Sequence, residues 1–475
     1  MISAGKPGQK ETTLVWLRDD LRIRDNPALH AATLRDGAVV ALYVLDDESD
    51  GIRPLGAASR WWLHGSLERL GDALAALGVP LVLRRGRSRE VVPAAAIAAN
   101  AGAVYWNRRY GSAEAAIDRD VETTLTEHGC AVETFAATLL HEPWTLRPAS
   151  GPHYRVFSPF WKAALDQGEP RKPLGAPDIR NRRAFPLDTD VLADWKLRPT
   201  RPDWSGGLAE TWRPGEEGAR DRLEDFLDGG LEGYAANRDR PDCHATSMLS
   251  PHLRFGEISP FQVWHAVRSG EPGNDAEKFL TELGWREFSW HLLFHNPDLA
   301  SVNFQKKFDA FAWRDDRTSL EAWQRGRTGI PMVDAGMRQL WHSGWMHNRV
   351  RMVAASFLIK NLMIDWREGE AWFWDTLVDA DAANNPASWQ WVAGSGADAA
   401  PYFRIFNPVL QGEKFDPEGR YVRTWVPELE GVPDRMIHKP WKAGASGSGG
   451  DYPQPIADLG ETRRRALSAF KDLPG

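Results

Sequence analysis

A change in the periodicity of apolar residues near residue 140 constrains the fold of this chain more than any other feature. Before that point, short apolar runs alternate with helical stretches such as Gly65–Leu77 and Glu114–Glu127. The predicted strands are Thr13–Leu17, Ala38–Leu45, Pro80–Leu83, Ala103–Trp106 and Ala131–Phe135. Asn26 and Pro27 supply an N-cap and a first-turn proline for the first helix. This alternation predicts an α/β domain with a doubly wound parallel sheet over residues 12–140, after a polar tail at residues 1–11.

Beyond residue 140 the strand pattern disappears. Residues 141–215 are rich in Pro and Arg and poorly periodic, which predicts an interdomain linker on the surface. Over residues 216–475 we expect a large all-α domain. Its clearest predicted helices are Ala219–Leu227, Pro260–Val267, Ala276–Phe294, Met332–His342, Val350–Met363 and Glu370–Val378.

Length and composition exclude several classes of protein. At 475 residues the chain exceeds the size of one hydrophobic core, so two domains are expected. The sequence has no run of about 18 apolar residues that would predict a membrane span, and its N-terminus lacks the apolar core of a secretory signal. Cys130 and Cys243 stand apart without metal-ligand neighbours, which argues against disulfide and zinc sites and favours a reducing cytoplasm.

Charge and tryptophan content narrow the interpretation further. The net charge, 58 − 65 = −7, argues against non-specific coating of nucleic acid but leaves room for a local basic groove. The chain has 23 tryptophans against 8 tyrosines. Most of these indoles are expected in the core, but their concentration after residue 285 also suggests stacking or electron transfer.

Three groups of polar residues are candidate sites, each with an alternative explanation. Thr246–Ser250, before Pro251, would be an anion site or a simple N-cap, and the residues alone favour the N-cap. Asp379 and Asp381 would be a helix-end carboxylate cluster or a pair that binds a polar ligand. A metal site is not expected there, because the neighbours are small or amide residues. His342 and His347 have the wrong spacing for a zinc pair on one helix face.

The stretch from Asn384 to Arg404 combines amides, two tryptophans, small residues and an arginine. It shows no propensity for a long regular element, and buried amides and indoles need partners, so we expect a binding loop. Basic residues lie beside aromatic ones in the same half of the chain, at Lys306, Lys307, Arg349, Arg351, Arg404 and Lys414. A solvated surface is the default explanation for such residues, but the interleaving also fits a nucleic-acid groove.

Several long motifs resemble the photolyase/cryptochrome family, most of all its bacterial cyclobutane pyrimidine dimer photolyases of class I or class III. The motifs are WLRDDLRIRDNPAL near the N-terminus, TSMLSPHLRFGEISP, ELGWREF at Glu282–Phe288, GWMHNRVRM at Gly344–Met352, MIDWREGE at Met363–Glu370 and SWQWVAGSGADAAPYFRIFNP. The resemblance extends from Thr12 to about Trp441, with matching order and spacing.

This resemblance implies a folded FAD in the helical domain. Tyr234 and the Thr246–Ser250 run would contact its phosphate side, and Asn385 would face flavin N5. An amide at that position can hydrogen-bond a reduced flavin without adding charge. The implied FAD contacts are Tyr234, Thr246, Ser247, Met248, Leu249, Ser250, Arg286, Asn348, Asp379, Ala380, Asp381 and Asn385.

The resemblance also implies light-driven repair of cyclobutane pyrimidine dimers in DNA, with the dimer flipped out of the duplex. An electron would pass from excited reduced flavin to the dimer and then return. Trp285 and Trp391 would stack on the dimer, and Glu282 would hydrogen-bond the pyrimidine edge and stabilise developing charge. The implied lesion and DNA contacts are Arg238, Glu282, Trp285, Asn348, Arg349, Met352, Trp391, Arg404 and Gln411.

Three tryptophans match the electron-transfer chain of the family. Trp389 would lie nearest the flavin, Trp366 next and Trp313 nearest solvent. With Glu282 and Asn385 they are the implied catalytic residues.

The antenna chromophore and the subclass depend on departures from the family pattern. Glu114 stands where folate-binding members have a carboxylate, but Ala113 replaces the neighbouring Asn. We therefore favour a methenyltetrahydrofolate antenna only slightly over an 8-hydroxy-deazaflavin or none. Pro386–Ser388 replaces a glycine pair of well-known bacterial members and resembles class III.

Alternative functions are a cryptochrome photoreceptor, a (6-4) photolyase and a flavoprotein oxidoreductase. Trp345–Arg349 matches cyclobutane-dimer enzymes rather than (6-4) enzymes, and a pyridine-nucleotide fingerprint is not visible. We expect a monomer that binds damaged DNA, with no metal and no membrane partner.

Overall fold

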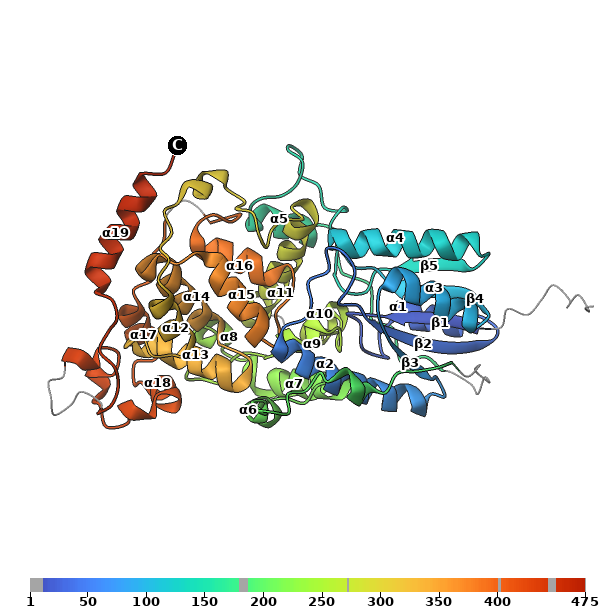
Figure 1. The fold of residues 1–475 in the computed structure, drawn as a ribbon, viewed down its shortest axis with the longest axis horizontal. Helices are drawn as coiled ribbons and strands as arrows, with labels where there is room; N and C mark the ends of the chain where they lie inside the picture. Colours follow the sequence, from blue (N-terminus) through green and yellow to red (C-terminus); the bar gives the residue numbers. More distant parts are fainter. Residues whose placement is uncertain (1–11, 179–186, 271–272, 400–402, 443–449, 475) are drawn as a thin grey trace, which may run out of the picture.

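The computed structural model describes residues 12–178, 187–270, 273–399, 403–442 and 450–474. The predicted polar tail, residues 1–11, lies outside the described residues. An α/β domain forms one end of the molecule and a helical domain the other (Figure 1).

In the described residues, the α/β domain is built on a five-stranded parallel sheet of order β3-β2-β1-β4-β5, which confirms the predicted fold class. The strands are β1 (Thr12–Leu17), β2 (Ala38–Leu45), β3 (Leu81–Arg85), β4 (Ala101–Asn107) and β5 (Ala131–Phe135). The helices between them are α1 (Pro27–Thr33), α2 (Ala57–Ala76), α3 (Ser88–Ala98) and α4 (Ser112–Glu127). Asn26 caps α1 as expected, since its side chain accepts a hydrogen bond from the backbone N–H of Leu29.

Both faces of the sheet are covered, because alternate strand residues point to opposite sides. Val15 and Leu17 of β1 pack with α1 and α2 in one core cluster. Leu14 and Trp16 pack with α3 and α4 in another. The strand order reverses between β1 and β4, so the loops that follow these two strands form the switch point where ligands bind in such sheets.

Residues 141–215, expected to lack regular structure, contain three short helices in the described part: α5 (Phe157–Leu165), η1 (Leu192–Trp195) and α6 (Gly206–Thr211). Phe157 and Phe160 of α5 are buried against α11, so this part of the predicted linker belongs to the helical core.

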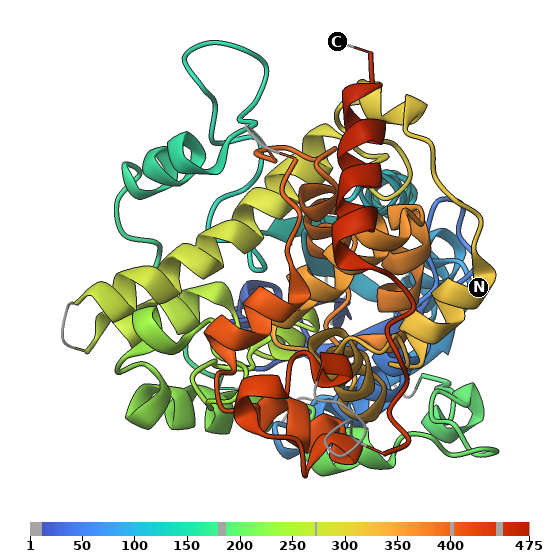
Figure 2. The same cartoon turned by 90° about the vertical axis from the view of Figure 1, so that its left-hand side faces the viewer.

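The helical domain carries the remaining elements. They are α7 (Glu216–Asp225), the π-helix η2 (Phe226–Gly230), α8 (Tyr234–Asn237), α9 (Ser250–Arg254), α10 (Pro260–Arg268), α11 (Asn274–His295), η3 (Lys306–Ala310), α12 (Arg317–Gln324), α13 (Pro331–Ser343), α14 (Asn348–Ser356), the π-helix η4 (Phe357–Leu362), α15 (Trp366–Thr376), α16 (Asn384–Ala393), α17 (Pro408–Phe415), α18 (Arg420–Trp425), η5 (Pro427–Leu429), η6 (Asp434–Met436), η7 (Pro440–Lys442) and α19 (Leu459–Lys471). Seen from the helical end, α19, drawn in red, lies on the outer face of the domain (Figure 2).

One sequence-based expectation in this domain is refined and another is wrong. The predicted helix Val350–Met363 is helical, as α14 followed by the wider turn of η4, which ends at Leu362; Met363 after it has a left-handed φ of 57°. Within η4 the buried Nζ of Lys360 donates to the carbonyl of Ala393 at 2.8 Å. The predicted loop Asn384–Arg404 begins with a regular helix, α16, which ends at Gly394 in a left-handed conformation.

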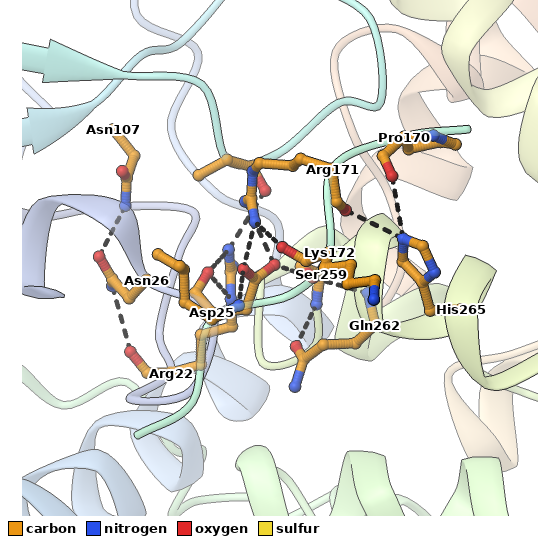
Figure 3. Close-up of polar contacts among 12 residues, drawn as sticks. Arg22, Asp25, Asn26, Asn107, Pro170, Arg171, Lys172, Ser259, Gln262 and His265 are labelled. Carbon is orange, nitrogen blue, oxygen red and sulfur yellow. Dashed lines mark hydrogen bonds and ion pairs between the residues drawn. The ribbon is translucent and has the colours of Figure 1, made fainter. Parts of the chain in front are cut away.

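The two domains are joined at the buried carboxylate of Asp25 (Figure 3). It accepts hydrogen bonds from Arg171 Nη1 at 2.5 Å, from Ser259 Oγ at 2.5 Å and from the backbone N–H of Leu174 at 2.9 Å. Arg22, also buried, donates to the carbonyls of Asp25 and Gly256. One loop after β1 thereby binds the 171–174 segment and the start of α10.

Candidate active site

Asp379, in the turn between α15 and α16, is the centre of the first polar group. Its carboxylate accepts two hydrogen bonds from Arg351 of α14, at 3.1 and 2.8 Å. It also accepts one from Ser250 Oγ at 2.6 Å. The structure therefore brings two implied FAD residues, Ser250 and Asp379, into contact, and adds Arg351 as a bidentate partner.

The Thr246–Ser250 segment approaches this carboxylate in an unusual conformation. Met248 has φ of 51°, in the left-handed region that non-glycine residues rarely occupy. In the described structure no side chain caps α9, although Pro251 stands in its first turn as expected. The simple N-cap interpretation is thus wrong, because Ser250 donates to Asp379 instead. Backbone strain held by surrounding contacts is typical of ligand sites.

Asn385, in the first turn of α16, is linked to the α/β domain through Glu370 of α15. Its Nδ2 donates to the Glu370 side chain at 2.8 Å and to the Glu370 carbonyl at 3.0 Å. Arg53 donates to both oxygens of this carboxylate, to Oε1 at 2.7 Å and to Oε2 at 3.0 Å, so Oε1 is shared between Arg53 and Asn385. Asn385 is buried, and the Glu370 side chain is 4% exposed.

Asp381 and Arg286 line a cavity of about 430 Å³ at the switch point of the sheet. The cavity walls come from both domains: Asp19, Asp20, Asn107, Arg108, Arg109, Tyr110, Thr138, Leu253, Arg254, Arg286, Trp290 and Asp381. Asp381 also accepts hydrogen bonds from the backbone N–H groups of Ala383 and Asn384, which shapes the start of α16. The carbonyl of Ala380 accepts from Arg254 Nε at 2.9 Å.

The implied lesion residues form ion pairs along α8, α11 and α14. Arg238 donates to Glu282 and lies over the ring of Tyr234, at 5.7 Å from its centroid. Arg349 is bonded to Asp239 at 2.7 Å. Burial raises the pKa of Tyr234. Arg238 therefore lies between Glu282 and the buried ring of Tyr234, whereas Arg349 lies over the ring of Phe415.

The two implied stacking tryptophans have different surroundings. Trp285 stacks on Phe157, with ring centroids 3.8 Å apart and an interplanar angle of 9°. Trp391 lines a cavity of about 330 Å³ with Arg404, whose guanidinium lies 5.6 Å from the Trp391 ring. The other residues of that cavity are Val392, Gly394, Asp398, Ala399 and Phe406.

The remaining implied residues are spread around these groups. Asn348 is exposed at the start of α14, Met352 is half-buried on the same helix, and Thr246 and Ser247 are half-buried before α9. Gln411 lies on α17, where its Oε1 is buried without a partner among the described residues. His347, just before Asn348, accepts a hydrogen bond from the Arg349 N–H, and burial lowers its pKa to about 4.

The part of the chain that the structure describes contains no cluster of three or more His, Cys, Asp or Glu suited to a metal ion. Within the same residues, no helix is both long and apolar enough to cross a membrane.

Comparison with known proteins identifies the family. The model "FAD binding domain of DNA photolyase" matches residues 279–472, and the model "DNA photolyase" matches residues 13–178. A deoxyribodipyrimidine photo-lyase of Agrobacterium fabrum is 50% identical, over 96% of this chain and 97% of its own. The chain belongs to the DNA photolyase family.

Two further relatives show the breadth of this family. The crystal structure of a bacterial class III photolyase from Agrobacterium tumefaciens has a TM-score of 0.94 and 49% identity, covering 99% of each chain. Cryptochrome-1 of Arabidopsis thaliana is 37% identical over 98% of this chain and 71% of its own.

In this photolyase-family chain the three implied electron-transfer tryptophans lie on or beside one hydrophobic core. Trp366 is 0% exposed and Trp389 is 2% exposed, whereas Trp313 is only partly buried against the same cluster. A Cβ on Gly369 would overlap the Trp389 ring, so this indole sits directly against α15, one turn from Trp366. The Trp366 Nε1–H donates to Asn303 at 3.0 Å.

Sequence reasoning missed three residues of this site and gave a fourth another role. Arg351 was expected only as a basic residue of a possible nucleic-acid groove. Glu370 stands inside the quoted motif MIDWREGE, but its partner Arg53 is distant in sequence. Arg254 follows the TSMLSPHL run and donates to Asp19 at 2.7 Å. Arg53 stands in a segment without a recognisable motif, so no local signal could have found it.

Proposed function

We propose that this protein repairs cyclobutane pyrimidine dimers in DNA, using light absorbed by reduced FAD, as a deoxyribodipyrimidine photo-lyase. The observation that carries this proposal is the 50% identity to a protein of that name over 96% of the chain. The contacts of the implied site residues support it: Asp379 binds Ser250, Asn385 binds Glu370, and Glu282 binds Arg238.

The residues present fit FAD. Ser250, Asp379 and Arg351 would hold its polar backbone, beside the strained Met248 turn. Asn385 would face N5 of the ring system with its oxygen, because its nitrogen is engaged by Glu370. When bound and reduced, FAD supplies the light-driven electron. The chain supplies position and exclusion of water.

On the DNA side, the cavity beside Trp391 and Arg404 would receive the flipped dimer. Indole faces there would stack on the flipped bases. Flipping costs unpairing and unstacking energy, and this cost is smaller at a damaged site than in an intact duplex. Glu282 would exchange its intramolecular partner Arg238 for the pyrimidine edge, which would release Arg238 for a DNA phosphate. Trp389, Trp366 and Trp313 would carry an electron from the surface when the flavin is oxidised.

For the antenna we propose the part of the switch-point cavity lined by the α/β domain, beside Arg109 and Tyr110, because Arg286 and Asp381 on the helical side are the implied FAD contacts. Methenyltetrahydrofolate is favoured slightly over 8-hydroxy-deazaflavin. This cavity lies at the switch point of the sheet, where ligands bind in open parallel sheets, and both domains contribute to its lining. In the described structure, Nε1 of Trp290 and Nε of Arg109 are buried there without hydrogen-bond partners. Unpaired donors of this kind suit a polar heteroaromatic ligand.

We further propose a class III enzyme that acts as a monomer in the cytoplasm. The 49% identity to a class III photolyase and the Pro386–Ser388 segment support the subclass.

The decisive experiment illuminates the reduced, purified protein with a thymine oligonucleotide that contains cyclobutane dimers. Return of the thymine absorbance only in light is the expected result. Absence of recovery would refute the repair function and favour a photoreceptor, whereas recovery only with a (6-4) lesion would assign the other class of photolyase.

A further inference from the structure

Asn385 is held by a chain of hydrogen bonds that begins in the other domain. Arg53 follows β2, in a segment that packs against α15: the Trp374 Nε1–H donates to the Pro54 carbonyl at 2.9 Å, and the Ala57 N–H donates to Asp375 at 2.9 Å. The guanidinium of Arg53 also lies 4.0 Å from the Trp374 ring centroid. These contacts fix the segment that carries Arg53, and the Trp374 ring supports its guanidinium, although the side chain is 36% exposed.

The hydrogen-bonding capacity of each group sets the direction of this chain. A guanidinium only donates, and an ionised carboxylate only accepts. Arg53 therefore keeps both oxygens of Glu370 as acceptors, one of which receives Nδ2 of Asn385. The Glu370 carbonyl accepts from the same nitrogen, so the amide cannot turn around without losing two hydrogen bonds. Its oxygen is left as an acceptor for a ligand.

We propose that Arg53 of the α/β domain is a positioning residue for the flavin: acting through Glu370, it makes Asn385 present an oxygen rather than an amino group. This inference rests on the proposed function, which places Asn385 opposite flavin N5. An acceptor there favours a flavin that carries a proton on N5, which is the reduced form, over the oxidised form, whose N5 only accepts. The α/β domain thereby shifts the midpoint potential of a flavin bound in the helical domain.

The test is the two-electron midpoint potential of bound FAD in Arg53→Gln, measured with the FAD dissociation constant. Loss of the ion pair leaves the buried Glu370 carboxylate uncompensated and removes the two donors that fix its position. A displaced carboxylate loses its hydrogen bond to Asn385 Nδ2, so only the Glu370 carbonyl still opposes rotation of the amide. We expect the preference for reduced over oxidised flavin to fall about tenfold, a shift of about 30 mV to more negative potential. Arg53→Lys, which keeps the charge but not the fork, should shift the potential less.

The matched control is Asp375→Ala, which removes a contact between the same segment and α15 without touching Glu370. Its potential should equal that of the wild type. In a Glu370→Gln background, Arg53→Gln should add less than about a twofold change, because the two residues act in series.

A wild-type potential in Arg53→Gln, or equal shifts in Arg53→Gln and Asp375→Ala, would overturn the inference. If Arg53→Gln does not fold, an unshifted potential in Arg53→Lys would overturn it equally. A potential shift in a protein that fails to repair dimers would refute the repair function alone. Repair by a wild type whose Arg53→Gln variant shows no shift would refute this inference alone.

Discussion

At the scale of single residues, Glu287 shows how burial changes an acid. It is 2% exposed on α11, beside Arg286, and accepts a hydrogen bond from the His141 N–H at 3.1 Å. Burial raises its pKa to about 7, although Arg286 and backbone N–H groups of the 140–141 segment lower it. The carboxyl group of Glu287 therefore binds a proton more tightly in the folded protein than in the unfolded chain. The stability that this protonation contributes is full below about pH 4.5 and is lost as pH rises through 7.

Glu287→Gln, which stays neutral, should flatten this pH dependence. The wild type should lose about 2–3 kcal/mol relative to the variant between pH 5 and pH 8. Thermal unfolding midpoints of both proteins across this range measure the difference. Glu277→Gln, on the exposed side of the same helix, should give a curve parallel to the wild type, and a parallel curve for Glu287→Gln would contradict the prediction.

Trp389→Phe should abolish photoreduction of oxidised flavin, because a phenyl ring is far harder to oxidise than an indole. Repair by chemically reduced enzyme should remain near wild type, since the dimer receives its electron from the flavin. Absorbance changes of the flavin under blue light measure photoreduction, and the return of thymine absorbance measures repair. Trp264→Phe, an equally buried indole outside this core, is the control. Equal loss of both activities would remove Trp389 from the electron-transfer chain.

At the scale of helices, α15 and α16 form the frame of the site. Glu370 and Trp366 lie on α15, Asn385 and Trp389 on α16, and Gly369 allows the close approach of the two helices. A side chain at Gly369 would overlap the Trp389 ring, so the packing there has no spare volume.

The same substitution in two helices should have opposite effects. Gly369→Ala should destabilise the protein by about 1–3 kcal/mol through overpacking against Trp389. Gly71→Ala in α2 should stabilise it by about 0.5–1 kcal/mol, because its Cβ would meet only Leu81, at 3.7 Å. Chemical denaturation of both variants measures these changes. Equal stability changes in Gly369→Ala and Gly71→Ala would mean that the loss of backbone entropy, and not packing against Trp389, decides the effect of both substitutions.

Sequence patterns predicted elements well where one local signal dominates. The bounds of β2 and β5 agree with prediction. The β2 strand is an apolar run between Gly37 and Asp46, and β5 starts shortly after Gly129. The α16 helix was missed, because Pro386 and two amides suggest a loop when tertiary partners are ignored. In the structure Pro386 stands in the first turn, where an N–H has no acceptor within the helix, and Asp381 satisfies the backbone before it. The η4 turn was missed for the same reason, since the carbonyl that binds Lys360 lies 33 residues away.

At the scale of the whole molecule, the domain junction concentrates buried polar groups around Asp25. Its side chain is 0% exposed and Arg171 is 33% exposed, so part of the ion pair is removed from water (Figure 3). Breaking such a pair on one side costs more than the pair itself contributes.

Asp25→Ala should destabilise the junction by about 2–4 kcal/mol, because Ser259, Leu174 and Arg171 lose their acceptor. Arg198→Ala, which removes a surface pair with Glu68, should change stability by less than about 1 kcal/mol. Thermal unfolding and limited proteolysis of residues 141–178 measure both. Comparable losses in the two variants would show that burial is not the deciding factor.

The position of Asp25 in the chain has a consequence for synthesis on the ribosome. Its partners Arg171 and Ser259 follow it by 146 and 234 residues. At roughly 5–20 residues per second, the acceptor emerges about 10 to 50 s before the hydroxyl that completes the junction. For the first part of that interval, until Arg171 emerges, the nascent α/β domain presents an unpaired carboxylate on the surface that the helical domain will cover. A charge without a protein partner is expected to keep that surface hydrated at this stage.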